Sequence, residues 1–201
     1  MTALWLVIAL SLGWVVFAYV GYPVLLFALA QLSPRPVSKG EATPALSIII
    51  AVHNGEDRLA AKLEQTLALD YPGPRQLIVA SDGSTDETEA IAKRFAEKGV
   101  ELVALAEQTG KEAAQAAAIR QATGEILVFT DLGAKLESGA LRAIVRPFAD
   151  ASVGSVSSED VVETEGGEGA YVRLEMALRR FESEAATLIG LSGSFFAVRR
   201  A

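Results

Sequence analysis

Two aspartates stand directly beyond short apolar runs, and each run has the form of a buried strand. Asp82 follows Leu77–Ala80 after one serine, and Asp131 follows Ile126–Thr130. Strands of a parallel sheet are near-continuous in apolar residues, and ligands of open α/β sheets bind beyond the carboxyl ends of such strands. We therefore expect Asp82 and Asp131 to lie at adjacent strand ends and to present their carboxylates to one ligand.

The residues after Asp82 also allow a purely structural interpretation. Gly83 and Ser84 break the strand, and Ser84 followed by Glu87 is a capping-box pattern that predicts the start of a helix. On this interpretation Asp82 and Ser84 only shape the turn and cap the helix. The second strand end of the same type, at Asp131, favours the ligand-binding interpretation.

The two strand ends belong to a regular alternation of strands and helices. Strands are predicted at 46–52, 77–80, 100–105, 126–130 and 153–156, with a last one within 193–200. Helices are predicted between the first five, beginning near residues 59, 84, 110 and 138. Strands that alternate with helices predict an α/β fold whose mainly parallel sheet is covered on both faces.

The first 34 residues carry no charged side chain, and Ala3–Leu32 is almost entirely apolar. A membrane-spanning helix needs ~20 apolar residues, so residues 1–32 are predicted to be an anchor that Pro23 kinks or divides. A signal peptide is the alternative, but the basic n-region is missing and the apolar run is too long. Arg35 and Lys39 follow the run, which predicts that the rest of the chain is cytoplasmic.

Composition limits the remaining possibilities. Residues 33–44 hold three prolines and a glycine, which predicts an extended linker to a domain at 45–201. The chain has 201 residues, a formal net charge of −7 and no cysteine. The negative charge argues against a nucleic-acid-binding protein, and the lack of cysteine excludes disulfides and thiolate metal sites.

Five acidic residues lie between Glu159 and Glu168. They would either gather a divalent cation or form a solvated loop, and the loop is the favoured interpretation. After them, Tyr171, Leu174 and Leu178 recur at helical spacing and predict an amphipathic helix.

Several motifs together resemble family 2 glycosyltransferases, in kind and in order. They are Leu46–Asn54, Ser81–Asp86, Gly110–Lys111, Gly124–Asp131 and Gly193–Arg200. The resemblance covers residues 45–201, and Tyr19–Pro23 resembles the N-terminal membrane helix of bacterial members that make surface polysaccharides. It implies a GT-A fold, a nucleotide-sugar donor such as a UDP-sugar, and inverting transfer to a saccharide or lipid-linked acceptor.

The resemblance also implies roles for four residues. Asp82 matches the carboxylate that binds the donor base. His53 matches a position against that base, or it is a strand-end histidine that bonds a loop carbonyl. Lys111 matches a basic residue near the diphosphate, against the alternative of a solvated lysine at a helix start. Asp131 matches the first Asp of the Asp-any-Asp motif, which holds ribose and a divalent metal, Mg²⁺ or Mn²⁺.

The sequence departs from that pattern at Gly133, where the second Asp of the motif is expected. One protein carboxylate is a thin shell for a hard cation. The catalytic base is expected beyond Ala201, so residues 1–201 are predicted to bind donor without turnover. Two hypotheses result. One is a membrane-anchored glycosyltransferase on the cytoplasmic side of the bacterial inner membrane. The other is a non-catalytic nucleotide-binding relative, or a partner subunit of a transferase.

Overall fold

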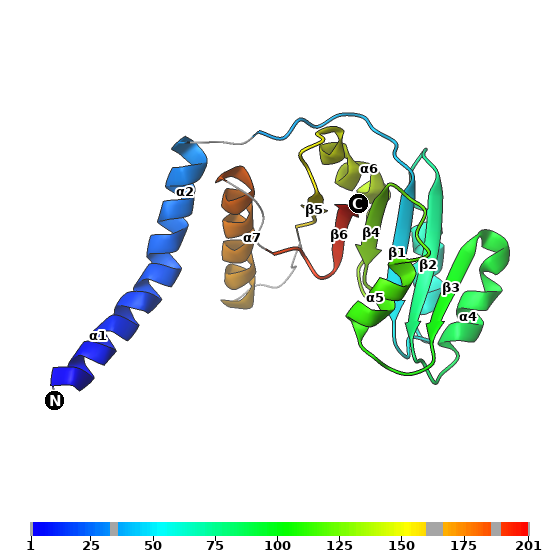
Figure 1. Ribbon diagram of the computed structural model, residues 1–201, viewed down its shortest axis with the longest axis horizontal. Helices are drawn as coiled ribbons and strands as arrows, with labels where there is room; N and C mark the ends of the chain where they lie inside the picture. The colour runs from blue at the N-terminus through cyan, green and yellow to red at the C-terminus, as the bar shows by residue number, and fades with distance from the viewer. Residues whose placement is uncertain (1, 33–35, 160–166, 186–189, 201) are drawn as a thin grey trace. The chain divides into compact units, whose positions relative to one another are not determined.

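The structure is a computed structural model, and it describes residues 2–32, 36–159, 167–185 and 190–200. The chain divides into two compact units. The helical unit comprises residues 1–36 and 159–190, and the sheet unit comprises residues 37–158 and 191–201. Figure 1 shows both, with the sheet and its helices in the sheet unit.

The sheet unit is built on six strands among its described residues. They are β1 (Leu46–Val52), β2 (Arg75–Asp82), β3 (Val100–Leu105), β4 (Ile126–Thr130), β5 (Ser155–Ser157) and β6 (Phe195–Arg199). Their order across the sheet is β3-β2-β1-β4-β6-β5. The first four strands in this order are parallel, and β6 runs antiparallel to both β4 and β5. The predicted α/β fold with a mainly parallel sheet is confirmed.

Helices cover both faces of the sheet because successive side chains of a strand point to opposite sides. Ile48 and Ile50 of β1 belong to one core together with residues of α3, α4 and α6, whereas Ile49 belongs to a second core with α5. The helices are α3 (Leu59–Leu67), α4 (Thr88–Arg94), α5 (Lys111–Ile119) and α6 (Ala140–Val145). Both cores are apolar, so they hold the strand ends in fixed register.

Strand β2 is longer than predicted. It continues to Asp82 instead of ending at Ala80, because Ser81 and Asp82 stay paired with β3. Polar residues here do not end the strand, since their backbone groups still find partners in the ladder. Asp82 is therefore the last residue of a rigid strand rather than the first part of a turn.

The predicted capping box at Ser84 is wrong. Helix α4 begins at Thr88, and the Thr88 N–H donates to Asp86 Oδ1 at 3.0 Å. The Ser84 hydroxyl oxygen instead accepts the backbone N–H of Asn54 at 3.2 Å. Ser84 thus ties the turn after β2 to the turn after β1.

The helical unit begins with α1 (Thr2–Val16), a π-helical turn (Phe17–Gly21) and α2 (Tyr22–Leu32). Together they form a run of 31 residues whose mean hydropathy reaches 2.2, and the run is long and apolar enough to cross a membrane. The π turn comes just before Pro23, whose missing N–H interrupts the regular hydrogen-bond ladder. The π turn is a local change in the helix before Pro23, and the helix itself continues from Thr2 to Leu32.

Helix α7 (Gly167–Ala185) confirms the predicted amphipathic helix and packs on α2. Phe181 meets Phe27 edge to face, with 5.5 Å between ring centroids, and the Tyr22 hydroxyl donates to Glu182 Oε1 at 2.8 Å. Of the acidic stretch before α7, residues 160–166 lie outside the described part of the chain. Glu159 forms an ion pair with Arg180.

Candidate functional site

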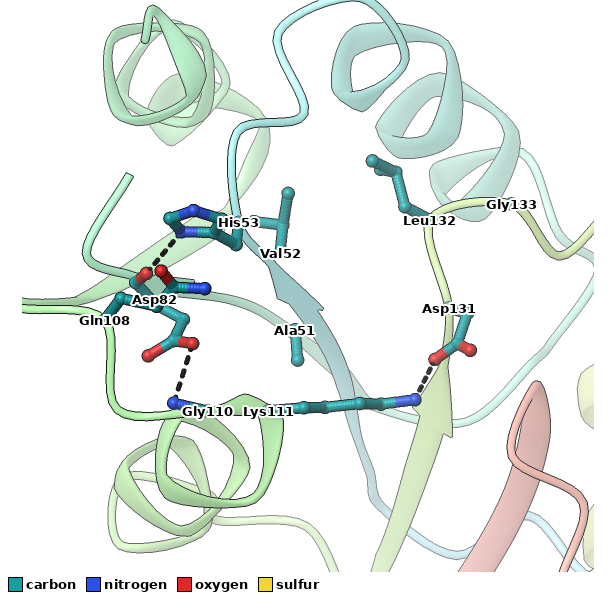
Figure 2. A pocket seen from close by; sticks show the side chains of 10 residues that line it. All are labelled: Ala51, Val52, His53, Asp82, Gln108, Gly110, Lys111, Asp131, Leu132 and Gly133. Carbon is teal, nitrogen blue, oxygen red and sulfur yellow. Dashed lines mark hydrogen bonds and ion pairs between the residues drawn. The ribbon is translucent and has the colours of Figure 1, made fainter. Parts of the chain in front are cut away.

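The carboxyl ends of β1, β2 and β4 open onto a pocket of about 440 Å³ in the sheet unit. This volume falls in the range of small-molecule sites. Figure 2 shows the side chains that line it. They are Ala51, Val52, His53, Asp82, Gln108, Gly110, Lys111, Asp131, Leu132 and Gly133. All four residues predicted to bind a nucleotide sugar are among them.

Asp82 and Asp131 were expected at adjacent strand ends, and this prediction is wrong. Strand β1 stands between β2 and β4, and His53 follows β1 directly. The two carboxylates therefore belong to opposite sides of the pocket, with His53 on the strand between them. This spacing suits an elongated ligand better than a small one.

The Asp82 carboxylate is buried and accepts three hydrogen bonds from one loop. Oδ1 accepts the Thr109 N–H at 2.7 Å and the Thr109 hydroxyl at 3.3 Å, and Oδ2 accepts the Gly110 N–H at 2.9 Å. The Thr109 N–H, helped by the Gly110 N–H, holds the pKa of Asp82 below its usual value, although burial acts in the opposite direction. Asp82 thus fixes the loop between β3 and α5.

His53 lines the pocket and also bonds a backbone carbonyl. Its Nδ1 lies 2.7 Å from the Asp82 carbonyl oxygen. A carbonyl oxygen only accepts, so Nδ1 carries the proton in this contact. His53 thus bonds a carbonyl, as the structural interpretation expected, although the carbonyl belongs to the last residue of β2 and not to a loop. Figure 2 shows the ring turned toward Asp82, and His53 is one of the residues that line the pocket.

Lys111 reaches from the start of α5 across to the end of β4 (Figure 2). Its Nζ lies 2.6 Å from Asp131 Oδ1 and donates to the Gly193 carbonyl at 3.2 Å. Both side chains of the ion pair are partly exposed, Lys111 by 46% and Asp131 by 39%. Exposed pairs contribute little to stability, so a charged ligand can displace this one at small cost.

The protein oxygens around Asp131 do not by themselves form a divalent-cation site. Asp131 is the acidic residue on the β4 side of the pocket lining, its Oδ1 is bonded by Lys111, and Gly133 offers no side-chain oxygen. Within the described residues no three His, Cys, Asp or Glu side chains gather in a way that would hold a metal. A hard cation needs several oxygens, which a bound diphosphate and water would have to supply.

Sequence reasoning missed the loop that Asp82 holds. Gln108 lines the pocket, and Thr109 supplies an N–H and a hydroxyl group, yet in the sequence they form an ordinary polar connection. Gly110 was noted only for the motif that it forms with Lys111, and not as a partner of Asp82. Lys62 was missed too, although a signal existed. It shares the spacing of Leu59 and Leu63 and so lies on the buried face of α3, where a charged residue is unusual.

Comparison with known proteins identifies the family. The model of glycosyl transferase family 2 matches residues 47–201. The chain belongs to glycosyltransferase family 2. β-Monoglucosyldiacylglycerol synthase of Synechocystis is 26% identical over 182 residues, which cover 81% of this chain and 38% of that protein. An N-acetylglucosaminyltransferase of a Rhizobium species is 29% identical over 120 residues, 58% of this chain and 27% of that protein. The chain spans less than half of either relative.

Solved structures confirm the predicted GT-A fold. A mannosyltransferase from Pyrobaculum calidifontis, in complex with GDP-Man and Mn²⁺, has a TM-score of 0.75 at 28% identity, over 92% of this chain and 54% of that one. Glucosyl-3-phosphoglycerate synthase of Mycobacterium tuberculosis, in complex with Mn²⁺ and UDP, has a TM-score of 0.55 at 23% identity. It covers 79% of this chain and 58% of its own, and shows the fold alone.

Proposed function

We propose that this glycosyltransferase chain binds a nucleotide sugar, and a UDP-sugar in particular, in the pocket at the ends of β1, β2 and β4. The whole enzyme would transfer the sugar to a saccharide or lipid-linked acceptor by inverting displacement. The observation that carries the proposal is the convergence of Asp82, Lys111 and Asp131 on one pocket of suitable size. The non-catalytic relative remains the alternative, and it shares the binding step.

On the β2 side, Asp82 would meet the base. A carboxylate offers about four acceptor positions, and three hydrogen bonds from Thr109 and Gly110 leave room for one more. Because the loop already fixes its orientation, the Asp82 carboxylate needs no reordering when a base N–H arrives. His53 would lie against the same base.

On the β4 side, Lys111 and Asp131 would meet the diphosphate and the ribose. Lys111 opens α5, and a helix N-terminus with an ammonium group favours anions. When a diphosphate enters, its oxygens compete with Asp131 for the ammonium. Lys111 would then offset the negative charge that grows on the leaving diphosphate during transfer. Asp131 would help to hold a divalent cation, Mg²⁺ or Mn²⁺, which would add positive charge near the leaving diphosphate.

The test measures nucleotide binding by purified residues 1–201 in detergent, and its readout is the midpoint of thermal unfolding. A ligand that binds only the folded state stabilises it, by about 2.7 kcal/mol at a concentration of 100 Kd. We expect UDP to raise the unfolding midpoint more than GDP does. Lys111→Met and Asp131→Asn should each weaken UDP binding about tenfold, since each removes a charge-assisted contact.

The matched control is Asp57→Asn, which removes an exposed carboxylate that does not line the pocket. It should bind UDP as the wild type does. Equal UDP affinity in the wild type, Lys111→Met and Asp131→Asn would show that the nucleotide site is elsewhere. No shift with any nucleoside diphosphate would reject the proposal.

We also propose that residues 1–32 anchor the protein in the bacterial inner membrane, with the sheet unit on the cytoplasmic side. Most side chains of α1 are exposed and apolar, such as Leu4 at 65% and Trp14 at 73%. Soluble proteins rarely expose so large a contiguous apolar surface to water. Alkaline carbonate should leave the protein in the membrane pellet, and protease added to intact cells should spare the sheet unit. Release by carbonate would contradict the anchor, and cleavage in intact cells would contradict the orientation.

A further inference from the structure

A lysine occupies a core position on α3. Leu59, Lys62 and Leu63 recur at the spacing of one helix face, and both leucines are fully buried. Lys62 is only 4% exposed. Burying an ammonium group is costly unless its N–H groups find acceptors, and an apolar side chain would fill this position without that cost. The presence of a lysine here therefore needs a reason other than packing.

The Lys62 ammonium holds the segment after β4 at both ends. Its Nζ donates to the Thr130 hydroxyl oxygen at 3.0 Å and to the Ala134 carbonyl oxygen at 2.6 Å. Asp131, Leu132 and Gly133 lie between these two contacts, and all three line the pocket. The Ala134 N–H donates to the Asp131 carbonyl at 3.2 Å, which closes the turn. Lys62 thus secures the backbone that carries Asp131, although it does not line the pocket.

The positive charge of Lys62 also acts on the β4 side of the pocket, where Asp131 lies. None of the ion pairs among the described residues includes Lys62. Burial lowers its pKa to about 8, and the negative charge of Asp131 opposes that shift. The group therefore stays mostly protonated at neutral pH and faces the field of Asp131. Asp131 therefore interacts with two ammonium groups, with Lys111 by direct contact and with Lys62 by its electrostatic effect on the Lys62 pKa.

We propose that Lys62 is a positioning residue for the β4 side of the nucleotide-sugar site. It clamps Thr130 and Ala134 so that Asp131 keeps the orientation in which it meets Lys111 and the incoming diphosphate. The inference rests on the proposed nucleotide site and deepens it, because it assigns a role to a residue outside the pocket lining. Lys62 acts through the backbone and does not touch the ligand.

The test compares Lys62→Met with Lys135→Met in the full chain in detergent. Met keeps much of the length of the side chain and removes the clamp, while Lys135 is an exposed lysine one residue beyond Ala134. We expect Lys62→Met to keep or raise the unfolding midpoint, because it removes a buried charge. It should weaken UDP binding about tenfold, as removal of a group that orients a ligand-binding residue does. Lys135→Met should change neither quantity.

Hydrogen–deuterium exchange of residues 131–136 in the nucleotide-free chain gives a second readout. Lys62→Met should speed exchange in this segment, and Thr130→Val should do so to a smaller degree. Thr130→Val should weaken UDP binding in the wild type but not in the Lys62→Met background, because it acts through Lys62. If Lys62→Met does not fold, Thr130→Val carries the same comparison with the wild type.

The outcomes separate this inference from the proposed function. If the wild type binds no UDP but Lys62→Met speeds exchange at 131–136, the clamp stands and the nucleotide site is wrong. If the wild type binds UDP and Lys62→Met binds equally well with unchanged exchange, the role of Lys62 is wrong. Parallel loss of stability and affinity in Lys62→Met would show a merely structural residue and would also overturn the proposal.

Discussion

The ends of β2 and β4 carry the same kind of residue in different physical states. Asp82 is buried and accepts three hydrogen bonds from the Thr109–Gly110 loop, and it takes part in none of the ion pairs among the described residues. Asp131 is partly exposed and pairs with Lys111. The comparison teaches that an aspartate at a strand end can build a pocket or face a ligand, and that burial and bonded partners decide which. The hydrogen bonds of Asp82 show the first, and the proposed function assigns the second to Asp131.

The glycines beside the two aspartates differ in the same way. Gly83 has a φ of +60°, and a Cβ there would lie 2.4 Å from both the Gln108 nitrogen and the Glu107 carbonyl carbon. A Cβ at Gly133 would meet nothing within 4 Å. At the end of β2 the neighbouring backbone therefore leaves no space for a side chain at Gly83, whereas after β4 there is space for a Cβ at Gly133.

The largest expected effect follows from this contrast. Gly83→Ala should destabilise the sheet unit by more than ~3 kcal/mol, because it adds a backbone clash to the strain of a left-handed conformation. Gly133→Ala should change stability by less than about 0.5 kcal/mol. Urea unfolding followed by circular dichroism measures both. Similar values for the two variants would contradict this difference in space between Gly83 and Gly133.

The second prediction concerns the two carboxylates. Asp82→Asn should lower the unfolding midpoint by about 5 °C, because an amide cannot accept all three hydrogen bonds without turning its NH₂ group toward a donor. Asp131→Asn should leave the midpoint within about 1 °C, since it removes an exposed ion pair. Thermal unfolding without nucleotide measures the difference. An equal loss in both variants would mean that burial does not separate their roles.

Much of the fold was predictable, and the reason lies in local signals. Strands 46–52, 100–105 and 126–130 were predicted to the residue because each is a mostly apolar run that begins one or two residues after Pro44, Gly99 or Gly124. The start of α4 was predicted wrongly because Ser84 bonds Asn54, a residue thirty positions earlier, and not its own helix. Local patterns report local hydrogen bonds and do not reveal such distant partners.

The same limit applies to the site. His53, Asp82, Lys111 and Asp131 were predicted because each stands at the end of a strand or the start of a helix in a recognisable order. The contacts between them were not predictable. Nothing in the sequence shows that Asp82 accepts from Thr109, that Lys111 reaches Gly193, or that Lys62 holds the segment after β4.

A third and smaller effect is the response to acid. The pKa of Asp82 in the native state is held below its unfolded value of about 3.9. At pH values between these two pKa values, the native state therefore binds fewer protons than the unfolded state. The stability from Asp82 is therefore complete above about pH 4 and is lost as the pH falls through the lower folded pKa. Asp82→Asn cannot titrate, and its stability should fall less steeply below pH ~4. Urea midpoints across this pH range measure the slopes, and equal slopes would contradict the hydrogen-bonded carboxylate.

The smallest expected effect concerns the segment after β4. Gly133 stands where the family pattern has a second Asp, and a Cβ added there would meet nothing within 4 Å. Since Asp131 alone is a thin shell for a hard cation, Mn²⁺ should improve UDP binding by the wild type less than about threefold. Gly133→Asp adds a carboxylate on the same turn and should raise the gain to about tenfold. Calorimetric titration of UDP with and without Mn²⁺ measures the gain.

Two controls make this result specific. Gly133→Ala tests the loss of glycine alone, and Gly133→Asn supplies an oxygen of similar position without the negative charge. Only Gly133→Asp should show the larger gain, because a hard cation prefers an ionised carboxylate to a neutral amide and gains nothing from a methyl group. In the absence of metal, Gly133→Asp should bind UDP more weakly than the wild type, since the new charge repels the diphosphate. A metal-dependent gain as large in the wild type as in Gly133→Asp would show that Asp131 and the diphosphate already complete the shell.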